Sequence, residues 1–159
     1  MDKTFKQRVD NFLAQKKIAF AGYSSLGAAV ANGLYDKFKN NGYTTYAVNP
    51  KYQDVKGVDC FPDLKSIPEK VDAVMISTPP EASLNIVKEC IELGIKHVWV
   101  HKSFGEGSFN QEAVDLAEKN GIEIIPQACP MMFLKPDPFH FCFRFIMNMK
   151  GRLKIKNLN

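Results

Sequence analysis

A unit of an apolar strand, a short turn, an amphipathic helix and a glycine repeats along the chain and limits the folds open to it. Five segments have the apolar content of buried strands: 17–22, 44–49, 72–77, 97–101 and 122–126. They are short and mostly apolar on both faces, which is typical of parallel strands covered by helices. The sequence therefore predicts an α/β fold, a doubly wound Rossmann-like parallel sheet of about five strands with helices on both faces and strand order 3-2-1-4-5.

Helical periodicity between the predicted strands supports this fold. Leu26, Val30, Leu34 and Phe38 recur every four residues and predict one apolar helix face. Three glycines lie between a predicted helix and the next predicted strand, where a left-handed residue would end the helix. These glycines are Gly42, Gly94 and Gly121.

The length of the chain predicts one domain, and the distribution of charge sets its C-terminal end apart. We expect a single domain over 1–159, with an N-terminal helix in 1–16 and an aromatic and basic extension in 134–159. The formal net charge is +4, and every charged side chain after Asp137 is basic. A solvated basic tail explains this asymmetry more simply than a nucleic-acid or membrane patch, so we expect no nucleic-acid partner.

The cysteines and the apolar runs predict a cytoplasmic protein. The four cysteines form no C-x-x-C pair, so a zinc site has no support and we expect no metal. No run approaches the ~20 apolar residues that span a bilayer, so we expect no membrane span. No N-terminal stretch has the order of a signal peptide, and reduced thiols are the default in the cytosol.

The turn after the first predicted strand, GYSSLG, has the composition of a phosphate-binding loop. Its glycines let the backbone approach a ligand, and the next helix offers free N–H groups and a partial positive charge to an anion. Ser24 and Ser25 add hydroxyl donors, although either could simply cap the helix. The G-x-G-x-x-G spacing of a dinucleotide site is missing. The candidate ligand-binding residues here are Gly22, Tyr23, Ser24, Ser25 and Gly27.

The second predicted strand ends at Asn49, where NAD-binding folds usually have an Asp or Glu that accepts hydrogen bonds from the ribose hydroxyls. Here an amide is followed by Pro50 and Lys51, and Lys51 would attract a phosphate on the ribose instead. A lysine that only faces solvent is the alternative. The missing carboxylate argues against NAD, and we predict that Asn49, Pro50 and Lys51 belong to the site.

Two prolines follow the third predicted strand, in STPP. They make a stiff turn without N–H groups of its own, which could pack against a flat base. Pro80 could instead serve only to open the next helix. We predict that Thr78, Pro79 and Pro80 contact the ligand.

The loops after the last two predicted strands carry the remaining candidates. His101 and Lys102 could meet a phosphate or face water. Cys129 is placed where the last strand ends. Because ligands of such sheets bind beyond the carboxyl ends of the strands, Cys129 should face the same cleft, and we include His101 and Lys102 among the candidate ligand-binding residues.

The ordered series AGYSSLG, AVNPK, DAVMISTPP and GIEIIPQACP resembles the CoA-binding domain family, which is related to the N-terminal domain of the succinyl-CoA synthetase alpha subunit. The resemblance covers about residues 15–133 and implies a site for CoA or an acyl-CoA. It implies that the pyrophosphate lies on the turn from Tyr23 to Ser25, with Lys51 near the adenosine phosphates.

The resemblance also implies which part of the ligand lies beside each of the other loops. It implies that Thr78 and Pro79 lie beside the adenine and that the residues after Val100 lie near the ribose or pantetheine. The family's Cys-Pro pair corresponds to Cys129 and Pro130. A thiol that faces CoA could exchange into a mixed disulfide, although a small buried residue is the simpler interpretation.

Catalysis does not follow from the resemblance, because the ligase's phosphate-accepting histidine lies in a second domain without a counterpart here. We predict no catalytic residues and a small CoA-binding protein that acts as a carrier, sensor or regulatory module. The alternative is an NAD(P)-binding protein, because VDAVMISTPP and GIKHVWVHKSF also resemble the N-terminal half of glucose–fructose-type oxidoreductases. In those enzymes a lysine at the place of Lys102 works near the nicotinamide, but they need a second domain to hold the substrate.

The aromatic segment FHFCFRFIMNM, residues 139–149, fits two structures. Its four phenylalanines recur at period two, as in a strand, whereas Phe139, Cys142, Phe143 and Ile146 fit a helix equally well. Small domains seldom leave so many aromatic side chains in water. They either pack on the N-terminal helix or form a homodimer contact. The resemblance offers no counterpart for this segment.

Overall fold

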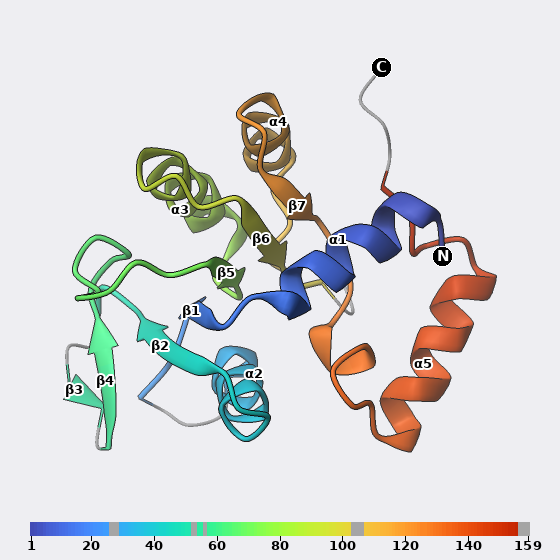
Figure 1. The fold of residues 1–159 in the computed structure, drawn as a ribbon, viewed down its shortest axis with the longest axis horizontal. Helices are drawn as coiled ribbons and strands as arrows, with labels where there is room; N and C mark the ends of the chain where they lie inside the picture. Colours follow the sequence, from blue (N-terminus) through green and yellow to red (C-terminus); the bar gives the residue numbers. More distant parts are fainter. Residues whose placement is uncertain (26–28, 52–53, 56, 103–106, 156–159) are drawn as a thin grey trace.

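β1 (Lys17–Ala21) lies in the middle of the sheet in the computed structural model, which describes residues 1–25, 29–51, 54–55, 57–102 and 107–155. The other strands are β2 (Thr44–Val48), β3 (Asp54–Val55), β4 (Val58–Phe61), β5 (Ala73–Ile76), β6 (His97–Val100) and β7 (Glu123–Ile125). Their order is β3-β4-β2-β1-β5-β6-β7, and all pairs are parallel except β3 with β4 (Figure 1). The predicted Rossmann-like α/β class is confirmed.

The predicted strand order is wrong in one respect. It put the strand at 72–77 beside the strand at 44–49, whereas β5 pairs with β1. The place beside β2 belongs to β4, a short strand in a region where no strand was predicted. With β4 included, the six parallel strands follow the order 3-2-1-4-5-6 of a Rossmann sheet.

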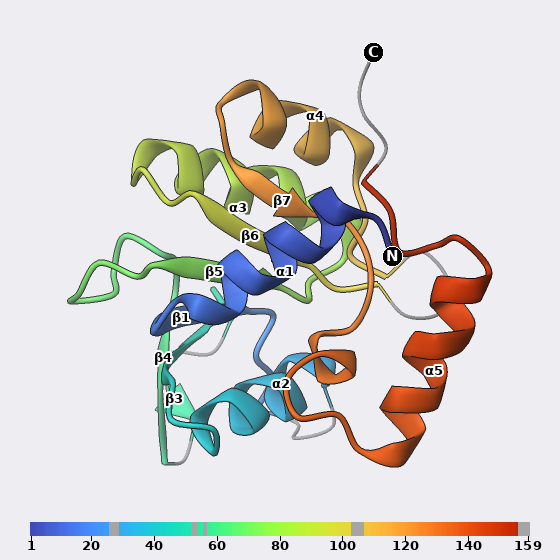
Figure 2. The ribbon, with the colours of Figure 1, turned by 45° about the vertical axis from the view of Figure 1, so that its right-hand side comes forward.

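Helices cover both faces of the sheet (Figures 1 and 2). One face carries α1 (Lys3–Ala14) and α2 (Val30–Lys39), and the other carries α3 (Pro80–Glu92) and α4 (Gln111–Lys119). The strand alternation separates two cores: Ile18 and Phe20 of β1 pack with α1 and α2, and Ala19 and Ala21 pack with α3 and α4.

The helical pattern of the sequence is confirmed except at one end. Leu34 and Phe38 are fully buried on α2, whereas Val30 is 51% exposed at its start and Leu26 lies outside the described residues. The three predicted helix stops have positive φ angles: Gly42, Gly94 and Gly121.

The aromatic segment forms a helix, α5 (Pro138–Met149), which lies at the side of the molecule beyond the 3-10 turn Pro130–Met132 (Figure 2). The Asp137 carboxylate begins the helix by accepting a hydrogen bond from the His140 N–H at 2.9 Å. Phe143 packs against the core that includes α1, but the side chains on the outer face of α5 remain exposed. Packing on α1 therefore does not cover most of these aromatic rings. Among the helices in the described part of the chain, none is long and apolar enough to cross a membrane.

Candidate functional site

Gly22 brings the loops after β1 and β5 into direct contact. Its φ is +101°, and its N–H donates to the Val48 carbonyl at 2.9 Å. A Cβ at this position would lie 2.6 Å from the Ser77 carbonyl oxygen, so no side chain fits there. The loop that ends β1 is thereby held against the loops that end β2 and β5.

The turn after Gly22 is held by a buried asparagine that the sequence analysis missed. Asn32 of α2 accepts a hydrogen bond from the Ser24 N–H at 2.9 Å and donates one to the Ser24 carbonyl at 2.8 Å. Tyr23 points into the core, where its ring packs edge-on against Tyr35 at 5.2 Å. Burial raises the pKa of the Tyr23 hydroxyl, with Asp36 a smaller cause. Only the backbone of Tyr23 is therefore suited to meet a ligand.

The sequence left open whether a serine of the GYSSLG turn caps the helix that follows, which is α2. Its N-cap residue is Ala29, whose side chain makes no capping hydrogen bond. Ser25 is exposed, and Gly27 lies outside the described residues. Alanine cannot cap the first N–H groups of α2, and N–H groups at a helix N-terminus are the feature that anions use.

Asn49 joins two loops rather than pointing freely into a cleft. Its side-chain amide donates to the Tyr23 carbonyl at 2.6 Å, and its Oδ1 accepts from the Lys51 N–H at 2.9 Å. This arrangement fixes the backbone at Lys51 while Pro50 and the Lys51 side chain stay exposed. Asn49 thus acts as a support for the loop, and Lys51 supplies its positive charge.

The loop after β5 contains two hydroxyl groups that are buried without a partner. Within the described residues, neither Ser77 Oγ nor Thr78 Oγ1 makes a hydrogen bond, although both atoms are shielded from solvent. The Ser77 N–H donates to the Ala21 carbonyl at 2.9 Å, which keeps this loop beside Gly22. Leaving such a group unpaired costs about 1–3 kcal/mol. Ser77 was not predicted as a site residue, although it belongs to the same STPP turn.

The two prolines of that turn have different surroundings. Pro79 is exposed as the N-cap residue of α3, so it is open to a ligand. Pro80 is the first residue of the helix, and its carbonyl accepts a hydrogen bond from the Asn110 side chain at 3.1 Å. Its role as a helix initiator accounts for Pro80.

The loops after β6 and β7 form a second, more apolar group. His101 is buried beside β5, where its N–H donates to the Ile76 carbonyl at 2.8 Å. Desolvation lowers the pKa of its imidazole, so the ring is neutral at pH 7 and poorly suited to attract phosphate. Lys102 pairs with Ala128 in an isolated bridge, and its ammonium lies 4.4 Å from the centre of the Phe109 ring.

Cys129 lies beside this bridge and begins the 3-10 turn. It is buried, and burial raises the pKa of its thiol. The thiol is therefore protonated at pH 7 and weakly nucleophilic. This setting favours the packing interpretation of Cys129 over the disulfide-exchange interpretation.

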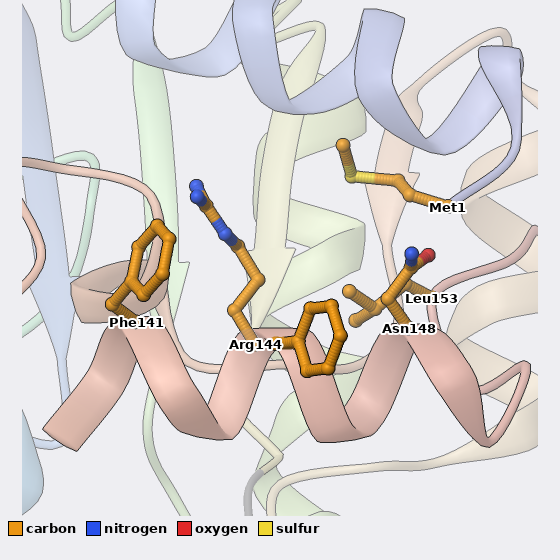
Figure 3. A pocket seen from close by; sticks show the side chains of 6 residues that line it. Met1, Phe141, Arg144, Asn148 and Leu153 are labelled. Atoms are coloured by element: carbon orange, nitrogen blue, oxygen red, sulfur yellow. The ribbon is translucent and has the colours of Figure 1, made fainter. Parts of the chain in front are cut away.

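A hollow in the described surface lies away from these loops. It measures about 290 Å³ and is lined by Met1, Phe141, Arg144, Phe145, Asn148 and Leu153. Figure 3 shows that the labelled side chains of α5 face Met1 and Leu153 across it. It contains none of the predicted site residues.

Comparison with known proteins identifies the part of the chain that carries the candidate site. A family model described as a CoA binding domain matches residues 16–135. The chain is 29% identical over 144 residues to acetate–CoA ligase (ADP-forming) I of Archaeoglobus fulgidus, which corresponds to 87% of this chain and 21% of that enzyme. The chain thus spans about a fifth of that curated relative, whose remaining length it does not match.

Solved structures support the same assignment. A hypothetical protein from Pyrococcus horikoshii is similar with a TM-score of 0.72 and 31% identity, covering 80% of this chain and 87% of that one. Prb, a PH1109 protein redesigned for binding, has a TM-score of 0.73 and 25% identity and covers 99% of this chain and 97% of its own. The similarity to Prb thus extends over the C-terminal segment, for which the sequence resemblance offered no counterpart. The comparisons do not favour the NAD(P)-binding alternative.

Proposed function

Because this chain belongs to the CoA-binding domain family, we propose that it binds CoA or an acyl-CoA at the carboxyl edge of its sheet. In this proposal the ligand's pyrophosphate contacts the backbone from Gly22 to Ser25 and the start of α2. The Lys51 ammonium attracts the phosphate on the ribose. Pro79 packs against the adenine.

One observation carries the proposal. Within the described part of the chain, the hydroxyl groups of Ser77 and Thr78 are buried and unpaired, on the loop whose backbone contacts Gly22. A bound ligand with polar atoms would supply the missing hydrogen-bond partners once these side chains turn toward the end of the loop, where sheets of this kind bind their ligands. The residues present therefore fit a nucleotide-like ligand at this edge.

The proposed role is that of a cytoplasmic carrier, sensor or regulatory module. The relative from Archaeoglobus fulgidus is a ligase, but this chain matches only 21% of its length, so ligase activity is not part of the proposal. The neutral His101 and the protonated Cys129 thiol add no activated base or nucleophile to the loops described above.

Calorimetric titration with CoA, dephospho-CoA, NAD and NADP tests the proposal. We expect CoA to bind more tightly than dephospho-CoA and NAD, because Lys51 meets the ribose phosphate that these two lack. Lys51→Met should weaken CoA binding about fivefold and leave the affinity for dephospho-CoA unchanged, since a charge-assisted contact contributes on the order of 1 kcal/mol at an exposed position. Tighter binding of NAD than of CoA would refute the proposal.

A further inference from the structure

The outer face of α5 is apolar along its whole length. The exposed fractions are 67% for Phe139, 53% for Phe141, 61% for Phe145 and 73% for Met149. Ile146 and Cys142 are exposed on the same helix, and Asn148 is the polar exception among its exposed residues. We call this surface, formed by Phe139, Phe141, Cys142, Phe145, Ile146 and Met149, the α5 face.

The α5 face carries no charge. The cation of the helix, Arg144, is turned toward the body, where its guanidinium lies 5.8 Å from the centre of the Phe133 ring and 5.2 Å from that of Phe141. A helix that binds a lipid surface combines its apolar face with cations on the adjoining polar face. Here the remaining cations follow the helix in sequence, so an apolar protein surface is the better match for the α5 face.

We propose that the α5 face binds the α5 face of a second copy of this chain, with the two helices antiparallel. Its five large side chains expose on the order of 500 Å² per chain, if each offers about 150–250 Å² when fully uncovered. Two copies would then bury at most about 1,000 Å² from these side chains, which is the lower limit for a biological interface before the surrounding residues are added. A surface of this kind is also near the upper limit of the patches that monomers leave exposed.

Charge at the helix ends favours the antiparallel orientation. Asp137 begins α5 and Lys150 follows its last residue. An antiparallel pair brings the acidic start of each helix level with the basic end of the other, and it also opposes the two helix dipoles. A parallel pair would bring the basic ends together.

The hollow beside α5 gives this surface a recess. Phe141 and Phe145 belong both to the α5 face and to the lining of the hollow, which also contains Arg144. Figure 3 shows that the Phe141 side chain faces the same side of α5 as Arg144. A side chain of the second copy can enter this recess while the helices pack against each other. The α5 face shares no residue with the proposed CoA site, which lies within the family match over residues 16–135, so the two surfaces can be tested separately.

Light scattering of the whole chain over a range of concentrations tests the proposal. We expect a dimer at micromolar concentration, and we expect Phe145→Glu to raise its dissociation constant at least about 100-fold, because two-fold symmetry introduces the charge twice. Val30→Glu is the matched control, since Val30 is an exposed apolar residue far from α5 in sequence, and it should leave the dimer unchanged. Circular dichroism confirms that each variant is folded.

Cross-linking locates the contact. Cys142 is exposed near the middle of α5, whereas Cys60, Cys90 and Cys129 are buried. A short bis-maleimide should therefore link two chains through Cys142, and Cys142→Ser or Phe145→Glu should abolish the linked dimer. A monomer at 100 µM, or a dimer that Phe145→Glu leaves intact, would overturn the proposal. So would a monomer that sediments with phosphatidylserine vesicles and loses this binding in Phe145→Glu, because the α5 face would then serve a membrane.

Discussion

The carboxyl edge of the sheet buries polar groups that are normally paired, whereas the outer face of α5 exposes apolar groups that are normally buried. At the edge, the Ser77 and Thr78 hydroxyls are buried without partners in the described structure. On α5, phenylalanine rings are exposed without cover. Each departure costs stability in the isolated chain, and each cost is removed by a different partner, a polar ligand at the edge and an apolar surface at the helix. The two regions should therefore respond independently to substitution.

Gly22→Ala should have the largest effect. The new Cβ would meet the Ser77 carbonyl at 2.6 Å in a backbone conformation with φ of +101°, and neither atom belongs to a flexible side chain. We expect a loss of about 3 kcal/mol in the free energy of unfolding and a more than tenfold loss of CoA affinity. Denaturant unfolding and calorimetry measure the two quantities.

Gly42→Ala is the control for this variant. Gly42 also has a positive φ, of 86°, but nothing lies within 4 Å of the added Cβ. It should cost only about 1 kcal/mol and leave CoA affinity unchanged. Equal losses for the two variants would show that backbone conformation alone matters at Gly22 and that the close contact of the loops does not.

Phe145→Glu should separate the dimer and leave CoA binding intact, in contrast to Gly22→Ala, which should weaken CoA binding. Phe145 is 61% exposed and lies outside the carboxyl edge, so its replacement should change CoA affinity by less than twofold while it separates the dimer. Calorimetry of this variant beside light scattering provides the comparison. A parallel loss of CoA affinity would mean that the two regions are coupled.

Thr78→Val should separate ligand binding from stability. Removing a buried, unpaired hydroxyl removes its desolvation cost, so the free energy of unfolding should stay the same or rise by about 1 kcal/mol. CoA affinity should fall about tenfold, because the ligand loses a hydrogen bond. Thr44→Val, at the amino end of β2, is the matched control and should leave CoA affinity unchanged. A Thr78→Val variant that binds CoA as tightly as the original chain would remove Thr78 from the site.

The smallest expected effect is the contribution of His101 to the pH dependence of the free energy of unfolding. Desolvation lowers the pKa of His101 below its ordinary value of about 6.5, so the unfolded chain takes up a proton at a pH where the folded chain does not. Its contribution to stability is complete above about pH 7 and is lost as the pH falls toward the lowered pKa. We expect the free energy of unfolding to fall between pH 7.5 and 5.5, and to fall less in His101→Gln. Identical pH profiles for the two proteins would contradict this assignment.

Much of the fold was predictable because five strands are apolar on both faces and therefore stand out in the sequence. β4 did not stand out, because it is short and carries Asp59 on an exposed side. Its omission shifted the predicted order, since the region before β5 appeared to lack a strand. The structure of α5 was undecided because alternate phenylalanines also fit a strand. The pair Asp137–Pro138, a cap followed by a first-turn proline, was the local signal for a helix.

The candidate site was predictable at the level of loops and less so at the level of atoms. A parallel sheet requires its carboxyl ends to meet at one edge, which is why the loops at Gly22, Asn49 and Thr78 were grouped correctly. Sequence alone did not reveal Asn32, because a polar residue inside a helix has no visible partner until Ser24 is placed beside it. The burial that makes His101 neutral was hidden for the same reason.

A crystal structure of the whole chain with CoA tests the central claim most directly. We predict that the pyrophosphate contacts the backbone from Gly22 to Ser25 and that the ligand, or water bound to it, pairs with the hydroxyls of Ser77 and Thr78. We also predict that the α5 face remains free of ligand. CoA bound in the hollow beside α5, with both hydroxyls still unpaired, would contradict the account.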